Sequence, residues 1–215
     1  GNLQAAGERC REGESLAPQY AIDFMRLRAE LLVALGQAEE AQDIYRRVLE
    51  SKAVPWARLG LARTLYMQKR FPEAEDDLHL LVKENRQYVD AYDWLARTLE
   101  AAGRLKEAQH ALEEAVAVSP HALRRLKRLG DIALETGDMA TAEKTLSEVV
   151  RKGKYSDFRD PEHHVKLVKI FVAKGDREQA EKTIRDLDRS MQGMKQTEAC
   201  SALSSAMVLS QAGEK

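Results

Sequence analysis

The sequence has little of what membrane proteins and disulfide-stapled proteins depend on. Only 2 of its 215 residues are cysteines, Cys10 and Cys200, and neither has a neighbour at metal-ligand spacing. We therefore expect two reduced thiols in a cytoplasmic protein rather than a disulfide framework. No apolar run approaches the roughly 18 residues that a membrane-spanning helix requires. A membrane partner is not predicted.

The chain also has no excess of charge of either sign. It carries 34 basic and 35 acidic residues, a formal net charge of −1. Proteins that bind nucleic acid usually show a basic excess or a basic face, so no nucleic-acid partner is predicted. The basic stretch at 124–128 is followed by Asp131 and Glu135, so we interpret it as the polar face of a helix. Contact with an acidic partner or RNA stays open as the alternative there.

Motifs that carry catalysis are missing as well. There is no phosphate-binding glycine loop, no Gly-x-Ser-x-Gly elbow and no Cys–His nucleophile pair. The five histidines form no ligand-spaced set, and we interpret His163-His164 as a solvated helix start. The acidic pairs Glu39-Glu40 and Asp76-Asp77 are interpreted as solvated helix faces. We therefore predict no enzyme activity, no catalytic residue, no cofactor and no metal.

What the chain does contain is an internal repeat. Only 5 prolines and 12 glycines interrupt a sequence rich in helix-forming residues. A turn followed five residues later by alanine occurs five times, at spacings of 33, 34, 34 and 38 residues. The turn residues are Gly36, Lys69, Gly103, Gly137 and Gly175, and the alanines are Ala41, Ala74, Ala108, Ala142 and Ala180. This period predicts a helix before each turn, the A helix, and a helix after it, the B helix.

Residues around each turn predict close helix packing. A large residue followed by a small one precedes the turn at Leu61-Ala62, Leu95-Ala96 and Leu129-Gly130. The small residue leaves room for the turn alanine of the B helix. A bulky residue lies four positions after each alanine and therefore on the same helical face. These bulky residues are Tyr45, Leu78, Leu112, Leu146 and Ile184.

These segments resemble tetratricopeptide repeats, most closely at Trp56-Ala-Arg-Leu-Gly-Leu-Ala and Ala91-Tyr-Asp-Trp-Leu-Ala. The resemblance implies an all-α fold, a right-handed superhelical solenoid of antiparallel helix pairs, in a single domain over 1–215. Five full repeats are expected at 22–54, 55–88, 89–122, 123–160 and 161–198. Half-repeat helices are expected at 3–13 and 197–212, so the chain is predicted to be cut from a longer solenoid. A terminal capping helix is the alternative for the last one.

The longer spacing before the fifth repeat predicts a loop at 151–161. Asp160 is expected to cap the next A helix and Pro161 to open it. The loop also carries Tyr155 and Phe158 beside basic residues. We favour aromatic side chains that fold back over the adjacent helices. A contact surface for a partner is the alternative.

Five longer sequence segments resemble a more specific group of repeat proteins. They are Leu27-Arg-Ala-Glu-Leu-Leu, Pro55-Trp-Ala-Arg-Leu-Gly-Leu-Ala, Ala91-Tyr-Asp-Trp-Leu-Ala, Ser119-Pro-His-Ala and Lys152-Gly-Lys-Tyr-Ser-Asp-Phe-Arg-Asp-Pro. They resemble the repeat region that follows a receiver domain in proteobacterial response regulators. The resemblance implies the output region of a two-component signalling protein, with a receiver domain N-terminal to this chain.

The repeat architecture implies that A helices line an extended groove for a protein or peptide partner. Projecting the A-helix faces yields the predicted lining. It consists of Arg26, Glu30, Trp56, Leu59, Arg63, Tyr66, Asp90, Asp93, Arg97, Lys127, Asp131 and Lys169. Burial of Trp56 and Tyr66 in the core is the alternative. We predict a protein-interaction module, with homo-oligomerisation through the solenoid ends as the second hypothesis.

Overall fold

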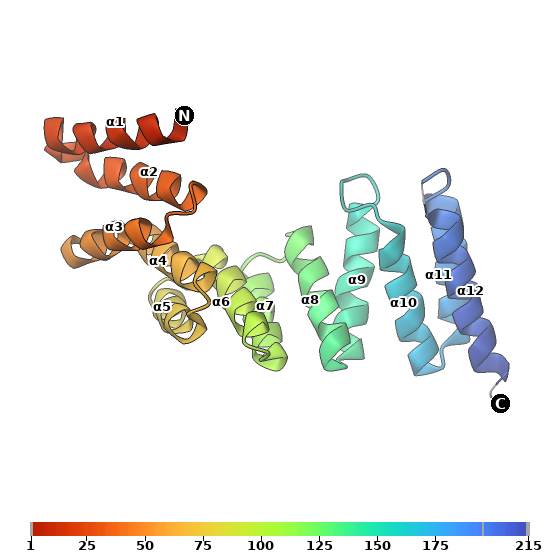
Figure 1. The fold of residues 1–215 in the computed structure, drawn as a ribbon. Coiled ribbons are helices and arrows are strands. Elements are labelled where there is room, and N and C mark those ends of the chain that lie inside the picture. Colours follow the sequence, from red (N-terminus) through yellow and green to blue (C-terminus); the bar gives the residue numbers. More distant parts are fainter. Residues whose placement is uncertain (1, 195, 214–215) are drawn as a thin grey trace. The chain divides into compact units, whose positions relative to one another are not determined.

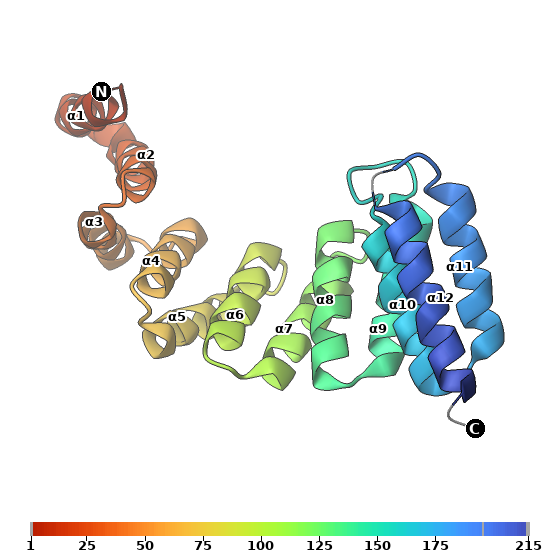
Figure 2. The ribbon, with the colours of Figure 1, turned by 45° about the vertical axis from the view of Figure 1, so that its right-hand side comes forward.

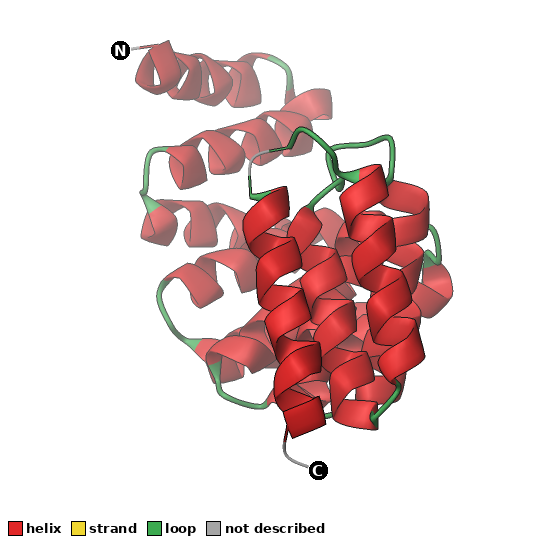
Figure 3. Cartoon of the chain, turned by 90° about the vertical axis from the view of Figure 1, so that its right-hand side faces the viewer, coloured by secondary structure: helices red, strands yellow, loops and turns green. Residues whose placement is uncertain are grey.

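The computed structural model describes residues 2–194 and 196–213, and this part of the chain is helical throughout, with no strand (Figure 3). The all-α prediction is confirmed. One 3-10 helix, Pro18–Tyr20, follows the first α-helix. The α-helices are α1 (Asn2–Leu16), α2 (Ala21–Ala34), α3 (Ala38–Ser51), α4 (Pro55–Met67), α5 (Phe71–Glu84), α6 (Val89–Ala101), α7 (Leu105–Val118), α8 (Leu123–Thr136), α9 (Met139–Gly153), α10 (Pro161–Lys174), α11 (Arg177–Ser190) and α12 (Thr197–Gly213).

The helices form two compact units, unit 1 (Gly1–Ala111) and unit 2 (Leu112–Lys215). In unit 1 each helix from α1 to α6 packs against the next one along the chain (Figure 1). In unit 2, α8 packs on α9, α9 on α10 and α10 on α11, while α12 contacts both α10 and α11 (Figure 2). The single domain and its repeat boundaries stay predictions, and residues 1, 195, 214 and 215 lie outside the described residues.

The turns between A and B helices have the backbone conformation that the repeat predicts. Gly36, Gly103, Gly137 and Gly175 have φ values of 77°, 77°, 83° and 75°. Lys69 occupies the same position with φ 61°, a left-handed conformation that costs a residue with a Cβ about 1 kcal/mol or more. All five turns therefore have a residue in the left-handed conformation, which is common at the end of an α-helix.

Small residues on the A helices allow a neighbouring helix to approach closely. A Cβ atom added to Gly60 of α4 would lie 2.4 Å from the ring of Tyr45 in α3. One added to Gly130 of α8 would lie 2.7 Å from Cγ of Leu146 in α9. The bulky residues predicted on the B helices form the core, since Tyr45, Leu78, Leu112 and Leu146 are buried. Ile184 is only partly buried at the edge of that core.

The start of α10 confirms one prediction and corrects another. Asp160 accepts a hydrogen bond from the backbone N–H of Glu162, and Pro161 occupies the first helical position. The interpretation of His163-His164 as a solvated helix start was wrong. His163 is 3% exposed and His164 is 1% exposed, because both imidazoles lie under neighbouring helices rather than on the polar face.

The loop before α10 is shorter than the predicted 151–161, because α9 continues to Gly153 and α10 begins at Pro161. Its two aromatic side chains have different environments. Phe158 is half-buried and packs over Gly153, the last residue of α9. Tyr155 is 91% exposed, with the Nζ atom of Lys154 5.4 Å from its ring centre. The aromatic side chains therefore fold back at Phe158 only.

One acidic pair is also less exposed than expected. Asp77 is half-buried and accepts a hydrogen bond from Arg58 of α4 at 3.1 Å. Burial raises the pKa of Asp77, and the Arg58 guanidinium opposes that shift. Asp77 therefore ties α5 to α4 instead of belonging to a solvated face. Within the described residues, no helix combines the length and the apolar character needed to cross a membrane.

Candidate functional site

The predicted lining residues fall on A helices of both units. Unit 1 holds nine of them on α2, α4 and α6, namely Arg26, Glu30, Trp56, Leu59, Arg63, Tyr66, Asp90, Asp93 and Arg97. Lys127 and Asp131 lie on α8 of unit 2, and Lys169 on α10. In unit 1 the three A helices contact one another in sequence, because α2 contacts α4 and α4 contacts α6.

Trp94 of α6 is at the centre of the arrangement in unit 1. The guanidinium carbon of Arg97 lies 4.9 Å from the centre of the Trp94 ring, and that of Arg63 lies 5.3 Å from it. The ring of Tyr66 meets Trp94 edge-on with 5.5 Å between ring centres. A cation above an indole face is stabilised by the ring quadrupole. Both guanidinium groups therefore contribute to holding the Trp94 ring in place.

Trp94 was missing from the sequence-based lining. The segment containing it was interpreted as part of the repeat signature, and of this helix only Asp90, Asp93 and Arg97 were assigned to the lining. Trp94 is half-buried, and Arg97 follows it by three residues, a spacing that puts both on one helix face. That spacing is the signal that could have found it.

Trp56 of α4 forms a second contact of the same kind. The guanidinium carbon of Arg26 lies 5.4 Å from the Trp56 ring centre, and Nε of Arg26 donates to Glu30 at 3.1 Å. On its other side Trp56 meets Tyr45 edge-on, with 6.3 Å between ring centres. Trp56 is therefore shared between the core and the surface. We call Trp56, Tyr66, Trp94, Arg26, Arg63 and Arg97 the aromatic–arginine cluster.

Leu59 differs from the other predicted lining residues of unit 1. It is 7% exposed, so it offers almost no surface to a partner. Its side chain is covered by its neighbours in the fold, which a projection of one isolated helix does not take into account. Trp56 and Tyr66 are half-buried and pack against the core of unit 1.

The phenols near this cluster report its charge. Burial raises the pKa of Tyr45 and of Tyr88. The guanidinium groups of Arg26 and Arg63 oppose the increase at both phenols. Glu30 near Tyr45 and Asp90 near Tyr88 act in the opposite direction to the two arginines, so these phenols lie in a field of mixed charge.

The predicted residues of unit 2 are arranged differently. Asp131 of α8 accepts hydrogen bonds from Lys127 at 2.9 Å and from Lys166 of α10 at 2.6 Å. Burial opposes ionisation of Asp131, but the two lysines outweigh it and lower its pKa. Asp131 therefore bridges α8 and α10 and is engaged within the unit. Lys169 is exposed on α10.

No described residues form a metal-binding group, because no three His, Cys, Asp or Glu side chains within 2–194 and 196–213 are placed to share an ion. The side chains brought together in unit 1 are aromatic rings and guanidinium groups, which bind ligands through stacking and hydrogen bonds. Their chemistry suits recognition of a peptide or protein surface.

Comparison with protein families identifies the repeat. The family model described as tetratricopeptide repeat matches residues 26–88 and 95–157. Together these two segments cover more than half of the chain. No curated protein sequence matches it.

Solved structures with similar folds include several repeat proteins. YrrB, described as a repeat protein with an unusual peptide-binding site, has a TM-score of 0.67 at 17% identity, over 90% of this chain and 97% of its own. PilF of Pseudomonas aeruginosa has a TM-score of 0.67 at 16% identity, over 94% of this chain and 90% of its own. The first repeat domain of RPAP3, bound to the HSP90 peptide SRMEEVD, has a TM-score of 0.51 at 23% identity, over 54% of this chain and 93% of its own. At these identities the similarity concerns the fold alone.

Proposed function

The chain belongs to the tetratricopeptide repeat family, and on that premise we propose that it binds a peptide segment of a partner protein. The proposed site is the aromatic–arginine cluster of unit 1. Binding rather than catalysis is the proposed role. The observation that carries the proposal is the indole of Trp94, whose ring has the guanidinium groups of Arg63 and Arg97 within cation–aromatic distance and meets the ring of Tyr66 edge-on.

Residue types in the cluster support this role. Tryptophan, tyrosine and arginine dominate the energetics of protein interfaces because each combines a large contact area with a directed polar group. Stacking occupies the face of a guanidinium group and leaves the N–H groups at its edge able to bind a carboxylate. The cluster therefore suits a peptide with a carboxylate next to an apolar or aromatic side chain. Peptide binding by YrrB and by the RPAP3 domain supports this class of ligand by analogy.

The test is affinity capture from the native cytosol by the wild-type chain and by three variants. Trp94→Ala removes the ring, and Arg97→Glu removes one stacked cation and reverses its charge. Lys83→Glu is the matched control, because Lys83 is exposed on α5, outside the cluster. Partners of the site are retained by the wild type and by Lys83→Glu and are lost by the other two.

If Arg97→Glu and Trp94→Ala bind the partners as strongly as the wild type does, the aromatic–arginine cluster is not the binding site. Circular dichroism of each variant distinguishes a lost site from a lost fold. Calorimetry with the identified partner peptide then measures the loss. We expect a decrease in affinity that corresponds to about 2 kcal/mol or more for Trp94→Ala.

Homo-oligomerisation through the ends of the helix stack is the second candidate. It is supported by exposed apolar residues on the first and last helices, because Leu16 of α1 is 84% exposed and Leu209 of α12 is 64% exposed. Light scattering over a range of concentrations tests this candidate. A monomer at every concentration rules it out for this chain.

We also propose that the chain is the output region of a two-component signalling protein. This proposal rests on the five segments that resemble response regulators, and it includes an N-terminal receiver domain and a cytoplasmic location. The longer gene product tests it directly. If a receiver domain precedes this region, phosphorylation of that domain should change how much partner the repeats capture.

A further inference from the structure

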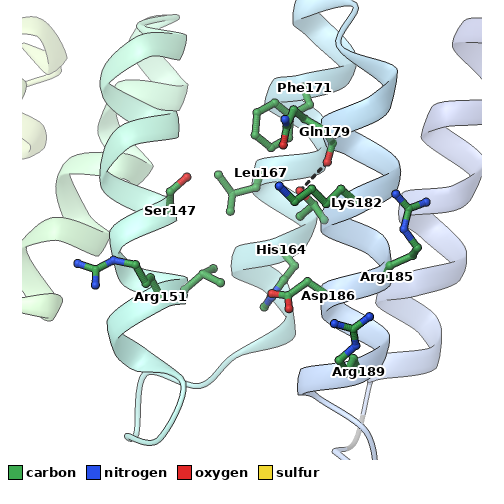
Figure 4. Close-up of a pocket in the computed structure, with 12 residues that line it drawn as sticks. Ser147, Arg151, His164, Leu167, Phe171, Gln179, Lys182, Arg185, Asp186 and Arg189 are labelled. Carbon is green, nitrogen blue, oxygen red and sulfur yellow. Dashed lines mark hydrogen bonds and ion pairs between the residues drawn. The ribbon is translucent and has the colours of Figure 1, made fainter.

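Unit 2 contains a groove that lies apart from all predicted lining residues. It runs between α9 and α11, and α10 forms its floor (Figure 4). Its volume is about 540 Å³. Val150, Leu167 and Phe171 provide apolar lining, and Leu167 and Phe171 are 4% and 8% exposed. The volume lies within the ~300–1,000 Å³ of typical ligand pockets.

The two walls of the groove are basic. Arg151 stands on the α9 side, and Lys182, Arg185 and Arg189 stand on α11 (Figure 4). The acid among the lining residues is Asp186, which lies 3.4 Å from Nε2 of the buried His164. Four cations and one carboxylate therefore belong to the lining, although the guanidinium groups of Arg151 and Arg185 point away from the floor of the groove (Figure 4).

Some of these cations are compensated within the unit and others are not. Arg151 pairs with Glu148 at 2.8 Å, and Arg185 lies 3.9 Å from Glu181. Lys182 and Arg189 have no ion-pair partner among the residues that the structure describes. These two side chains define the unsatisfied positive charge of the wall.

The preceding repeat provides an internal comparison. A groove of about 530 Å³ lies between α7 and α9 over α8, in equivalent positions shifted by 34 or 38 residues. Leu129 and Lys144 correspond there to Leu167 and Lys182. The position of Arg151, however, is occupied by Ala117, and that of His164 by Leu126. We call the groove between α9 and α11 the basic groove and this one the neutral groove.

The neutral groove also carries more acid. Glu113 and Glu148 face Lys144 and Lys152 among its lining residues. The same repeat geometry therefore recurs with balanced charge in one copy and with a positive excess in the next. The excess belongs to particular residues of the basic groove and not to the repeat.

We propose that the basic groove binds a short acidic peptide segment of another protein, with an apolar side chain against the partly exposed Val150 and carboxylates beside Lys182 and Arg189. Charge complementarity favours an acidic peptide, and the apolar lining favours an apolar residue between the acidic residues of that peptide. This site is separate from the aromatic–arginine cluster, so each can fail without the other.

Nucleic acid suits the groove less well than a peptide does. Proteins that bind single strands offer exposed aromatic faces on which bases stack. Phe171 is nearly buried and the remaining floor is aliphatic, so the groove has no such platform among its described lining residues. An oligonucleotide is therefore the competing probe in the test.

The test measures fluorescence anisotropy with a fluorescein-labelled peptide of sequence Glu-Glu-Leu-Phe-Glu-Glu. The variant Lys182→Glu/Arg189→Glu reverses the two uncompensated charges. Lys52→Glu/Lys106→Glu is the matched control, with the same change of charge at exposed positions outside the basic groove, the neutral groove and the predicted lining. We expect the first variant to weaken binding by roughly tenfold or more and the control to change it little.

Two further probes separate the site from diffuse attraction. The peptide Glu-Glu-Ser-Ser-Glu-Glu keeps the charge and lacks the apolar side chains, and oligouridylate offers phosphates. Weaker binding of both supports the proposal. It is overturned if the wild type does not bind the first peptide, if both double variants bind it equally, or if either of the other probes binds as tightly. Thermal melts confirm that the variants are folded.

Discussion

The two units use one repeat to build two different surfaces. In unit 1, Arg63 and Arg97 stack on the ring of Trp94, on the side of the A helices. In unit 2, Arg151 and Arg189 line a groove between the B helices α9 and α11. The buried positions of the repeat are alike in both units, because Leu78 and Leu146 are fully buried at equivalent sites. The helix-pair scaffold therefore keeps its buried positions alike and allows its exposed positions to differ between the two units.

The sameness of the two cores can be tested by truncation at equivalent sites. Leu78→Ala and Leu146→Ala each remove a side chain that is 0% exposed and leave a cavity. We expect each to lower the free energy of unfolding by about 2–5 kcal/mol. Urea denaturation followed by circular dichroism measures both. A cost several-fold smaller in one unit would show that the repeats are not equivalent.

The close approach of A and B helices can be tested at two glycines. Gly60→Ala would place a methyl group against the ring of Tyr45, and Gly130→Ala would place one against Leu146. Overpacking of this kind costs about 1–3 kcal/mol, which exceeds the gain in helix propensity. Gly7→Ala is the control, because an added Cβ there meets nothing within 4 Å. Thermal melts should show Gly7→Ala at or above wild-type stability and the other two below it.

The buried histidines of unit 2 predict a dependence on pH that His164→Leu should reduce. Burial lowers the pKa of His164, and Asp186 and Asp160 oppose this only in part. In the unfolded chain this histidine binds a proton near pH ~6.5, whereas the buried imidazole of the folded chain does so only at lower pH. The free energy of unfolding is therefore highest above pH ~6.5 and decreases as the pH falls below it. Leucine already stands at the equivalent position of the neutral groove, Leu126.

The measurement is the melting temperature of each protein at several pH values between neutral and mildly acidic. The wild type should lose more stability on acidification than His164→Leu does. The remaining slope should include His163, whose pKa burial also lowers. Identical slopes for the wild type and for His164→Leu would show that His164 does not contribute.

The smallest predicted effect concerns the one turn without glycine. Lys69→Gly removes a side chain from a backbone with φ 61°, whereas the other four turns already have glycine. We expect stabilisation by about 0.5–1 kcal/mol, offset in part by the greater freedom of glycine in the unfolded chain. Gly103→Ala should have the opposite sign, since its φ is 77°. A loss of stability in Lys69→Gly would mean that the lysine side chain makes a stabilising contact.

Local features of the fold could be predicted well because they depend on short-range patterns. The turn residues, the buried residues four positions after each alanine and the cap at Asp160 all follow from spacing along one or two helices. The surfaces were harder to predict. Trp94 reads as a signature residue of the repeat, and its role emerges only when Arg63 of the preceding A helix reaches its ring.

The pair His163-His164 was predicted to be exposed and is buried, again because the outcome depends on packing between helices. Histidines next to a helix start are typical of solvent-exposed positions, so polarity alone predicted exposure. Their burial depends on how closely α9, α11 and α12 cover α10, which is a property of packing among helices distant in sequence. No spacing within the pair carries that information.

The helical repeat, its period and its turns follow from the sequence alone, because backbone propensity and hydrophobic spacing act over a few residues. Which side chains share a surface depends on the tertiary structure, because residues 26, 63 and 97 lie on three helices beside the rings of Trp56 and Trp94, and residues 151, 182 and 189 line one groove from two helices. Cation–aromatic contacts and grooves therefore form between residues that are distant in the sequence. They arise from distances in space that a repeat of 34 residues makes possible but does not specify.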